Sequence, residues 1–356
     1  MSATRVQIFK NAESDPKPSM RIYAEELIQS LKKYSSFEIN EVSIKGTQLP
    51  FLKDAISKDC FYPLYARLRE GDINHIIDHS YGAVAYGLNP RHTVVTCHDL
   101  IPLELKSQSS WLGRKRFLYN VRGMLRARNI IAVSESTKQS ILKHFRYEGR
   151  IWVIPQGINE NFKKIKNPKR IEEVKRDLRM NERYRYLLHV GLSTPTKNVE
   201  LILRSLANLP QCQLIKVGRF TPRQIQMIKE LNIEERVSVL ALVPQEKLTE
   251  IYNVVDLLIA PSLFEGFGLP VVEAMACGCP VICSKTSSLP EVAGDAAVYI
   301  DPLSEKSLRE AIDKVLMDGS LREKLMEKGL ERAKQFSWEK TAAEVLKVYK
   351  EILSHG

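Results

Sequence analysis

The sequence predicts an α/β fold made of two doubly wound, Rossmann-like domains that face each other across a cleft. At 356 residues the chain is too long for one ordinary hydrophobic core. Short β-rich runs alternate with amphipathic helical stretches, which is typical of parallel sheets covered by helices. This alternation occurs in two successive series. The composition, 44% hydrophobic and 27% charged, is that of a globular protein.

The first half contains four apolar runs that we expect to be strands with their exit loops. They lie at 73–80, 92–99, 129–136 and 150–157. Helical stretches are expected between and before them, at 20–34, 113–127 and 135–145. The first 70 residues give only weak periodic signals beyond the first of these helices.

The second half repeats the pattern with clearer signals. Strands are expected at 185–191, 212–218, 236–242, 256–262, 280–284 and 296–302. Helices are expected at 198–207, 221–231, 245–252, 270–277, 305–317 and 320–336, followed by a last amphipathic helix at 336–353.

The domain boundary is predicted from a change in composition. Residues 162–175 are charged, poor in large apolar side chains and interrupted by Pro168, so we expect a linker near 163–170. The first domain would span 1–165 and the second 170–337. The helix at about 338–356 would follow the second domain and could pack back on the first.

The net charge of +11 is concentrated in one half of the chain. Residues 1–170 hold 28 Lys and Arg against 16 Asp and Glu, whereas the remainder holds 25 against 26. A basic first half favours an anionic partner, and the alternative is a solvated surface that aids solubility. No nucleic-acid-binding motif accompanies the charge, so a membrane surface or a phosphorylated substrate is favoured over nucleic acid.

The sequence favours a cytoplasmic protein without a metal site. No apolar run approaches the roughly 18–20 residues of a membrane helix, and the first residues lack the apolar stretch of a secretory signal. Six cysteines are present, three of them in the C-x-C-x3-C run at 277–283. That run is apolar and has no histidine nearby, so buried free thiols are expected in place of a zinc site.

The stretch at 256–282 carries the clearest chemical signal. A buried strand leads to a loop with Glu265, Gly266 and Gly268, and Pro270 then opens a helix, where proline is favoured. The glycines allow a ligand to approach the backbone, and amides at the helix start attract an anion. Glu273 follows eight residues after Glu265, so a phosphate here would be flanked by two acceptors suited to sugar hydroxyls.

These residues resemble those of a known family. The string at 260–282 is similar to the E-x7-E element of family-4 retaining glycosyltransferases, which have the GT-B fold. Further similar strings lie at 97–104, 132–141, 154–158, 289–302 and 336–342. The resemblance spans roughly residues 75–350 and is strongest in the second half.

The resemblance implies a donor site. Glu273 would accept hydrogen bonds from the ribose hydroxyls, and Glu265 would contact the transferred sugar. The diphosphate would be held by Lys197, which follows Gly191 at the end of the first strand of the second domain, and by backbone amides. Those amides belong to Phe267, Gly268 and Leu269.

Two departures from the family pattern concern the diphosphate. Many members carry an arginine directly after the glycine, where this chain has Leu192, and Arg219 is a candidate for the second positive charge. The family also has a glycine-rich loop after its first strand. Residues 11–27 contain no glycine, and Ser19 or Arg21 could contribute there instead.

Acceptor-side residues are expected at strand ends of the first domain. His98 matches the histidine of the family's His-Asp pair and would orient the transferred sugar, while Asp99 would cap the following turn. His79 and Ser80, at another strand end, are further acceptor-side candidates.

The implied reaction is retaining, metal-independent hexosyl transfer from a nucleotide-diphosphate sugar, with GDP-mannose or UDP-glucose favoured and no cofactor. The chain has no D-x-D motif. The acceptor would be a hydroxyl of a glycan or of a lipid-diphosphate-linked glycan, in bacterial polysaccharide or glycolipid assembly. Two alternatives stay open: a catalytically inactive sugar-nucleotide-binding subunit and a sugar-nucleotide epimerase of the same fold.

Residues 111–128 combine six Lys and Arg side chains with Trp111, Leu112 and Phe117 on a predicted helix. Such a basic amphipathic helix can lie on an anionic membrane, which suits a lipid-linked acceptor and peripheral attachment to the inner face of the cell membrane. The alternative is a helix that packs on the core and leaves its basic face in solvent.

Overall fold

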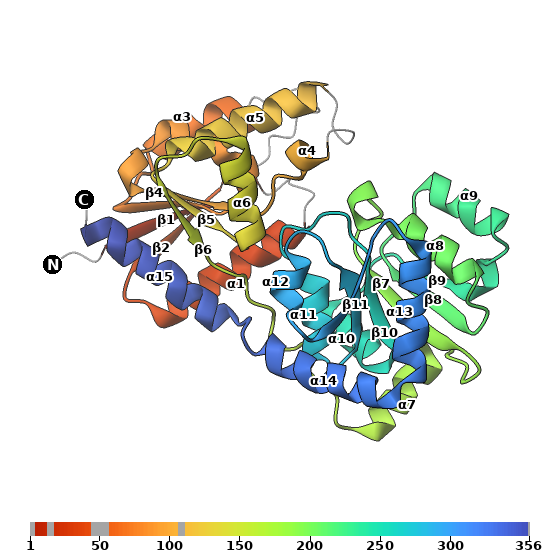
Figure 1. Ribbon diagram of the computed structural model, residues 1–356. Coiled ribbons are helices and arrows are strands. Elements are labelled where there is room, and N and C mark those ends of the chain that lie inside the picture. The colour runs from red at the N-terminus through yellow and green to blue at the C-terminus, as the bar shows by residue number, and fades with distance from the viewer. Residues whose placement is uncertain (1–3, 13–17, 44–56, 106–110, 355–356) are drawn as a thin grey trace. The chain divides into compact units, whose positions relative to one another are not determined.

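The computed structural model describes residues 4–12, 18–43, 57–105 and 111–354, and it divides into two compact units. Unit 1 contains Met1–Gly157 and Ser337–Gly356, and unit 2 contains Ile158–Phe336 (Figure 1). The chain leaves unit 1 before the charged segment 163–170 that composition indicated as a linker. That segment belongs to unit 2, because Phe162 is buried there against the ring of Tyr252 and helix α7 (Pro168–Asp177) begins within it.

Unit 1 is built on a six-stranded parallel sheet with the order β2-β1-β3-β4-β5-β6. Four of these strands lie within the predicted runs. Strands β1 and β2 lie in the region that gave no strand signal, since each has only five residues and β2, at the sheet edge, is mostly polar. The bounds are β1 Arg5–Phe9, β2 Glu38–Val42, β3 Ile73–Ile76, β4 Thr93–Cys97, β5 Asn129–Ala132 and β6 Arg150–Val153.

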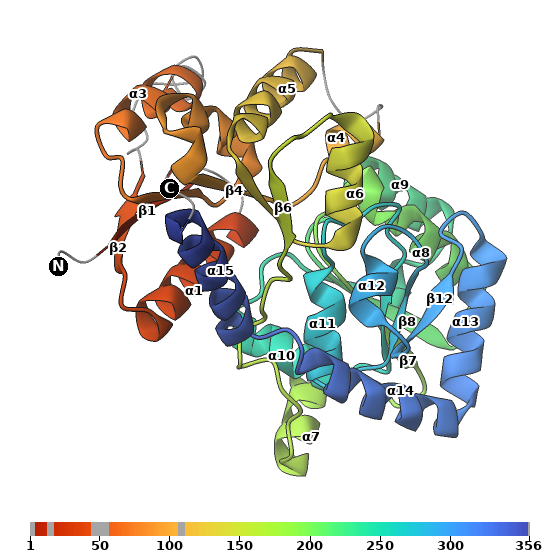
Figure 2. The ribbon, with the colours of Figure 1, turned by 60° about the vertical axis from the view of Figure 1, so that its left-hand side comes forward.

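Both faces of this sheet are buried. Successive residues point to opposite faces, so Val94 and Ile131 join one hydrophobic cluster while Val95 and Ile130 join another. The first cluster lies under α1 (Pro18–Tyr34) and α15 (Trp338–Ser354), which run side by side in both ribbon views (Figures 1 and 2). The second lies under α3 (Tyr62–Arg67), the 3-10 helix η2 (His79–Gly87) and α5 (Trp111–Arg126). Shorter elements are η1 Ser57–Phe61, η3 Pro90–His92, α4 Ile101–Glu104 and α6 Glu135–His144.

Unit 2 contains a second six-stranded parallel sheet, with the order β12-β11-β10-β7-β8-β9. Its strands are β7 Arg185–Val190, β8 Cys212–Val217, β9 Val237–Leu240, β10 Leu257–Ala260, β11 Val281–Ser284 and β12 Ala297–Ile300. Its helices after α7 are η5 Pro195–Lys197, α8 Val199–Ala207, α9 Pro222–Glu230, η6 Glu234–Arg236, α10 Gln245–Val254, α11 Leu269–Ala276, α12 Leu289–Ala293, α13 Glu305–Met317 and α14 Gly319–Ala333. The predicted fold class, two doubly wound parallel sheets, is confirmed.

Two further expectations can be compared with the structure. Of the six free cysteines, all but Cys60 are buried, as the apolar context of the C-x-C-x3-C run predicts. Among the helices in the described ranges, none is both long enough and apolar enough to cross a lipid bilayer.

The last helix, α15, is fixed to the sheet of unit 1 by a buried polar contact. His75 on β3 is fully buried, with its Nδ1 2.6 Å from the hydroxyl of Tyr349 and its Nε2 2.8 Å from Oγ1 of Thr96. Burial lowers the pKa of His75 to about 3, so the ring stays neutral and each ring nitrogen has a partner. The end of the chain therefore completes the core of the unit that contains its beginning.

We predict that Tyr349→Phe lowers the free energy of unfolding by about 1–3 kcal/mol, because it leaves Nδ1 of His75 buried without a hydrogen-bond partner. Denaturant unfolding monitored by circular dichroism measures this change. Tyr34→Phe is the matched control, since Tyr34 is exposed on α1 and should change the stability little. Equal stabilities of the two variants would contradict a structural role for the His75–Tyr349 contact.

Candidate functional site

Two loops meet at the carboxyl edge of the sheet in unit 2. Strands β7 and β10 are hydrogen-bonded neighbours and run parallel, so the loops that follow them leave from the same edge. The amide of Leu263, after β10, donates to the carbonyl oxygen of Thr196, after β7, over 2.7 Å. This contact brings together Lys197 and Glu265, which are 68 residues apart in sequence.

An ion pair forms the centre of this edge. Nζ of Lys197 lies 2.6 Å from Oε1 of Glu265, and both side chains are largely buried. The hydroxyl of Ser262 donates to the same carboxylate oxygen over 2.7 Å. The backbone of the loop is held from the other side, because Oγ of Ser287 accepts the amide of Glu265 over 2.9 Å. The pair is therefore pre-organised by its neighbours.

Asn198 explains how Lys197 is placed. It joins η5 to α8 in the left-handed conformation, with φ of +53°, which asparagine tolerates better than most residues. Its side-chain amide donates to the carbonyl oxygens of Pro261, over 3.1 Å, and Pro302, over 2.7 Å. The turn is thereby anchored to the loops after β10 and β12, and Lys197 is held at the sheet edge.

The start of α11 offers unpaired backbone donors. Gly268 precedes the helix with φ of +105°, a backbone conformation that favours glycine because other residues rarely adopt it. Phe267 is buried with its ring against Phe336. No described residue accepts a hydrogen bond from the amides of Phe267, Gly268 or Leu269. Three free amides at a helix start can bind an anion.

Glu273 lies within α11, beyond the free amides of its first turn. The helix begins at Leu269, so Glu273 is in its second turn, where one carboxylate oxygen accepts the hydroxyl of Tyr252 over 2.9 Å. Desolvation raises the pKa of Glu273 to about 7, against the lowering effects of Tyr252 and of the positive charge on Lys197. Near neutral pH the carboxyl group is thus divided between its charged and uncharged forms.

Lys197, Ser262, Glu265 and Gly268 line a pocket at the edge of the unit 2 sheet. Its lining residues are His189, Val190, Lys197, Leu258, Ile259, Ala260, Ser262, Glu265, Gly268, Pro270, Val271 and Leu289. Nδ1 of His189 is buried and has no hydrogen-bond partner among the described residues. Gly191, beside the ammonium of Lys197, has φ of +133°. Leu192 and Arg219 are both exposed.

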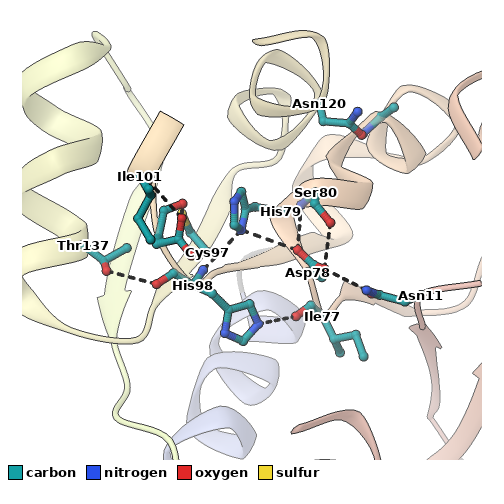
Figure 3. A network of polar contacts seen from close by, with 12 residues as sticks. Asn11, Ile77, Asp78, His79, Ser80, Cys97, His98, Ile101, Asn120 and Thr137 are labelled. Carbon is teal, nitrogen blue, oxygen red and sulfur yellow. Dashed lines mark hydrogen bonds and ion pairs between the residues drawn. The ribbon is translucent and has the colours of Figure 1, made fainter. Parts of the chain in front are cut away.

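The acceptor-side candidates gather around a buried carboxylate in unit 1 (Figure 3). Asp78 follows β3, and its oxygens accept the amide and the hydroxyl of Ser80, each over 2.7 Å, and the side-chain amide of Asn11 over 2.8 Å. Nδ1 of His79 lies 3.5 Å from the same carboxylate. Asp78 also caps η2, so β3 ends at Ile76 and the rest of the predicted run 73–80 is its exit loop and the start of η2.

His98 lies in the same network, after β4 (Figure 3). Its Nε2 donates a hydrogen bond to the carbonyl oxygen of Ile77 over 2.8 Å. Nδ1 is buried without a partner among the described residues. The backbone amide of His98 donates to Nδ1 of His79 over 3.3 Å. The ring of His98 packs edge to face against the ring of Tyr23, and this contact fixes the orientation of the imidazole. His98 and His79 are thus brought together.

The remaining candidates lie apart from this network or support it. Oδ1 of Asp99 accepts the amide of Ile101, the first residue of α4, over 3.0 Å, so Asp99 stabilises the turn between β4 and α4. Ser19 and Arg21 lie exposed in the first turns of α1. Most of the glycine-free segment before them, residues 13–17, lies outside the described residues.

Several polar residues of these sites were not singled out from the sequence. They are Asp78, His189 and Lys216. His189 and Lys216 are polar residues inside otherwise apolar strands, which is a usable signal because such residues need a partner when buried. Across the described residues, no three His, Cys, Asp or Glu side chains are arranged to hold a metal ion.

We predict that Glu273→Gln stabilises the unliganded protein above neutral pH. The pKa of Glu273 is higher in the folded state than the ordinary 4.5. The folded wild-type protein therefore loses stability relative to its unfolded chain as pH rises through about 7. The advantage of the variant should grow from near zero at pH 4.5 to on the order of 2–3 kcal/mol at pH 8.

Thermal unfolding at several pH values measures this difference, with Glu327→Gln on the exposed face of α14 as control. A pH-independent difference between Glu273→Gln and the wild type would show that the carboxyl is not perturbed by burial.

Comparisons with known proteins agree with the architecture. A family model described as "Glycosyl transferases group 1" matches residues 170–332, and one described as "Glycosyltransferase Family 4" matches residues 32–162. The chain is similar throughout to solved structures of sucrose-phosphate synthase from Thermosynechococcus elongatus, with a TM-score of 0.82 and 20% identity over 99% of this chain and 100% of that one. It is also similar to WaaG, with a TM-score of 0.75 and 17% identity over 97% and 99% of the two chains. At such identities the structures establish the GT-B fold.

Curated relatives match over shorter stretches. "O-antigen chain mannosyltransferase B" of Escherichia coli is 38% identical over 173 residues, which is 46% of this chain and 45% of the relative. "Serotype-specific mannosyltransferase WbdA" of Escherichia coli is 29% identical over 269 residues, 71% of this chain and 32% of the relative. The matched regions therefore cover less than half of these relatives. The two family models, which together extend through both units, and the fold lead to one conclusion: the chain belongs to the family-4 glycosyltransferases with the GT-B fold.

Proposed function

We propose that this protein is a retaining hexosyltransferase that uses a nucleotide-diphosphate sugar as donor. The observation that carries the proposal is the arrangement at the edge of the unit 2 sheet. A lysine paired with a glutamate lies at the same pocket as the free amides that begin α11. Cationic and amide donors suit the diphosphate of such a donor, and the carboxylates of Glu265 and Glu273 suit its hydroxyl groups.

In the proposed reaction the bond between the anomeric carbon and the leaving phosphate oxygen breaks first. Lys197 and the amides of Gly268 and Leu269 stabilise the negative charge that develops on the nucleoside diphosphate. The departing phosphate oxygen takes the proton of the acceptor hydroxyl, and that hydroxyl oxygen bonds to the anomeric carbon on the same face. Retention then needs no covalent enzyme intermediate, unlike the retaining glycosidases.

In this reaction Glu265 accepts hydrogen bonds from the transferred sugar and also holds Lys197 in place before the donor binds. Glu273 accepts hydrogen bonds from the ribose and must be ionised to accept two of them. Since its pKa is about 7, donor affinity is expected to fall as pH drops below neutrality. No D-x-D motif is present to bind a metal ion, so the positive charge is assigned to protein groups and the transfer is proposed to be metal-independent.

The names of the relatives support a choice of sugar and base. Mannosyltransferase relatives favour GDP-mannose, and the similar fold of Anabaena HepE in complex with UDP-glucose, with a TM-score of 0.78 and 19% identity, keeps UDP-glucose as the second candidate. The acceptor is proposed to be a hydroxyl of a glycan, free or linked to a lipid diphosphate, in bacterial surface polysaccharide assembly. It would bind unit 1, where the Asp78 network and His98 lie.

An anionic membrane surface is proposed as a partner of unit 1 through α5. Trp111 and Leu112 at its start are 68% and 70% exposed, and Lys115, Arg122 and Arg126 are exposed along the helix. The ammonium of Lys115 lies 3.7 Å from the centre of a Trp111 ring. The other face of the helix packs in the core through Val121 and Met124, so α5 combines a structural face with an exposed basic and apolar face.

We predict that Lys197→Met lowers the rate of hexosyl transfer by about 10²–10³-fold, because the leaving diphosphate loses its main cationic partner. A thermal-shift panel of GDP-mannose, UDP-glucose and ADP-glucose first identifies the donor, and release of the nucleoside diphosphate with acceptor then measures the rate. Lys229→Met, an exposed lysine on α9, is the matched control.

If none of the nucleotide sugars stabilises the wild type, the transferase proposal fails. Donor binding without transfer would favour the inactive-subunit alternative, and conversion of the donor to its epimer without acceptor would favour the epimerase.

We predict that reversing Arg122 and Arg126 to Glu weakens binding to anionic vesicles by at least about tenfold, since each basic residue near the surface contributes about 1 kcal/mol. Co-sedimentation with vesicles containing phosphatidylglycerol measures the binding. The same reversal at Lys229 and Lys324, both exposed on unit 2, controls for net charge. Equal loss in both variants would assign the binding to general charge and not to α5.

A further inference from the structure

A lysine lies inside the sheet of unit 2 with no acidic partner. Lys216 is the fifth residue of β8 and is completely buried, with an exposed fraction of 0%. Its ammonium donates to the carbonyl oxygen of Val217 over 2.8 Å and to that of Gly191 at short range. Among the described residues, no carboxylate forms an ion pair with it; Glu265, the acidic residue of this sheet edge, is paired with Lys197. A buried cation held only by neutral carbonyl oxygens is costly.

Both ammonium groups converge on Gly191. A Cβ placed there would lie 3.9 Å from Nζ of Lys197, and a Cβ placed on Gly218 would lie 2.8 Å from Nζ of Lys216 and 2.3 Å from the carbonyl oxygen of Gly191. Gly218, after the end of β8, thus leaves the room that the ammonium of Lys216 occupies. The carbonyl of Gly191 is fixed between the two strands by this lysine.

The charges around this point do not balance within the protein. His189 is opposite Lys216 in the strand register, and burial together with the two lysines lowers its pKa well below the usual range, so it stays neutral. The two lysine charges face the carboxylate of Glu265 and the carboxyl of Glu273, which is only partly ionised near neutral pH. Arg219, the residue after Gly218, is exposed and positively charged, so it does not offset the charge of Lys216. Burial and the nearby Lys197 lower the pKa of Lys216 to about 8, because no described residue close to the ammonium compensates its charge.

We propose that Lys216 is a positioning residue of the donor site: it holds the Gly191 turn in place and supplies the second positive charge for the donor diphosphate. This inference rests on the proposed function, because it takes the diphosphate as the anion that completes the charge balance. The residue after Gly191, Leu192, is apolar and 71% exposed, so the second charge comes from the strand below the turn and not from the turn itself.

The placement has a consequence for pH dependence. A bound diphosphate stabilises the charged form of Lys216, so binding and protonation are coupled. Donor affinity should therefore fall as pH rises through the range in which the free protein loses this proton. His189, already neutral, would not give a loss in that direction. Lys197 keeps an acidic partner at 2.6 Å.

The test is calorimetric titration of the wild type, Lys216→Met and Lys229→Met with the nucleoside diphosphate of the preferred donor, at pH 7 and pH 9. We expect the wild type and Lys229→Met to bind more weakly at pH 9. We expect Lys216→Met to bind about tenfold more weakly than the wild type at pH 7 and to lose the additional pH dependence, while its thermal stability is unchanged or raised. Wild-type affinity and an unchanged pH dependence in Lys216→Met would overturn the inference.

Two further arms separate the possible failures. If Lys216→Met does not fold, the same titrations are made with Lys216→Gln, and the pH dependence of wild-type affinity is the second readout. A wild-type affinity that does not change between pH 7 and pH 9 overturns the inference. Inorganic pyrophosphate is titrated in parallel as a probe of the anion site alone. If no nucleotide binds the wild type, the proposed function fails. Pyrophosphate binding that depends on Lys216 would then still support the anion site, and absence of pyrophosphate binding would overturn it.

Discussion

The ion pair between Lys197 and Glu265 organises the edge of the unit 2 sheet. It joins the loops after β7 and β10, and Ser262 adds a hydrogen bond to the same carboxylate oxygen. A partly buried pair of this kind gives limited net stability, because desolvation offsets much of the attraction. Its more specific effect is orientation, since the lysine and the carboxylate are both held where a ligand would meet them. The pocket exists because two parallel strands deliver their exit loops to one place.

The charged groups at this edge lower the stability of the folded protein. Glu273 is desolvated enough for its pKa to reach about 7, and Lys216 is buried without a carboxylate. A protein selected only for stability would replace both with apolar or neutral side chains. Their presence within a few strands of each other is what a site for a charged, hydroxyl-rich ligand requires, because a ligand with phosphate and ribose groups would satisfy each of them in the bound state.

Unit 1 shows a related arrangement with different groups. Asp78 is buried, but the side-chain amide of Asn11 and the amide and hydroxyl of Ser80 satisfy its oxygens, so the carboxylate acts mainly as an anchor for the loops after β1 and β3. His98 is fixed by the carbonyl of Ile77 and keeps one unused ring nitrogen. The last helix of the chain closes the core of this unit through Tyr349, so that both ends of the sequence support one sheet.

The sequence by itself determined the fold class, ten of the twelve strands, and the loop that carries Glu265 and the glycines, because apolar periodicity and glycine placement are local signals. It did not reveal β1 and β2, whose five residues are too few for periodicity to be distinctive. Only the tertiary structure decided that Lys197 pairs with Glu265, that Tyr252 donates to Glu273, and that Lys216 lies beneath Gly191. These contacts join residues that are distant in sequence, or on neighbouring strands, and depend on strand order and register. A linear pattern does not contain that information.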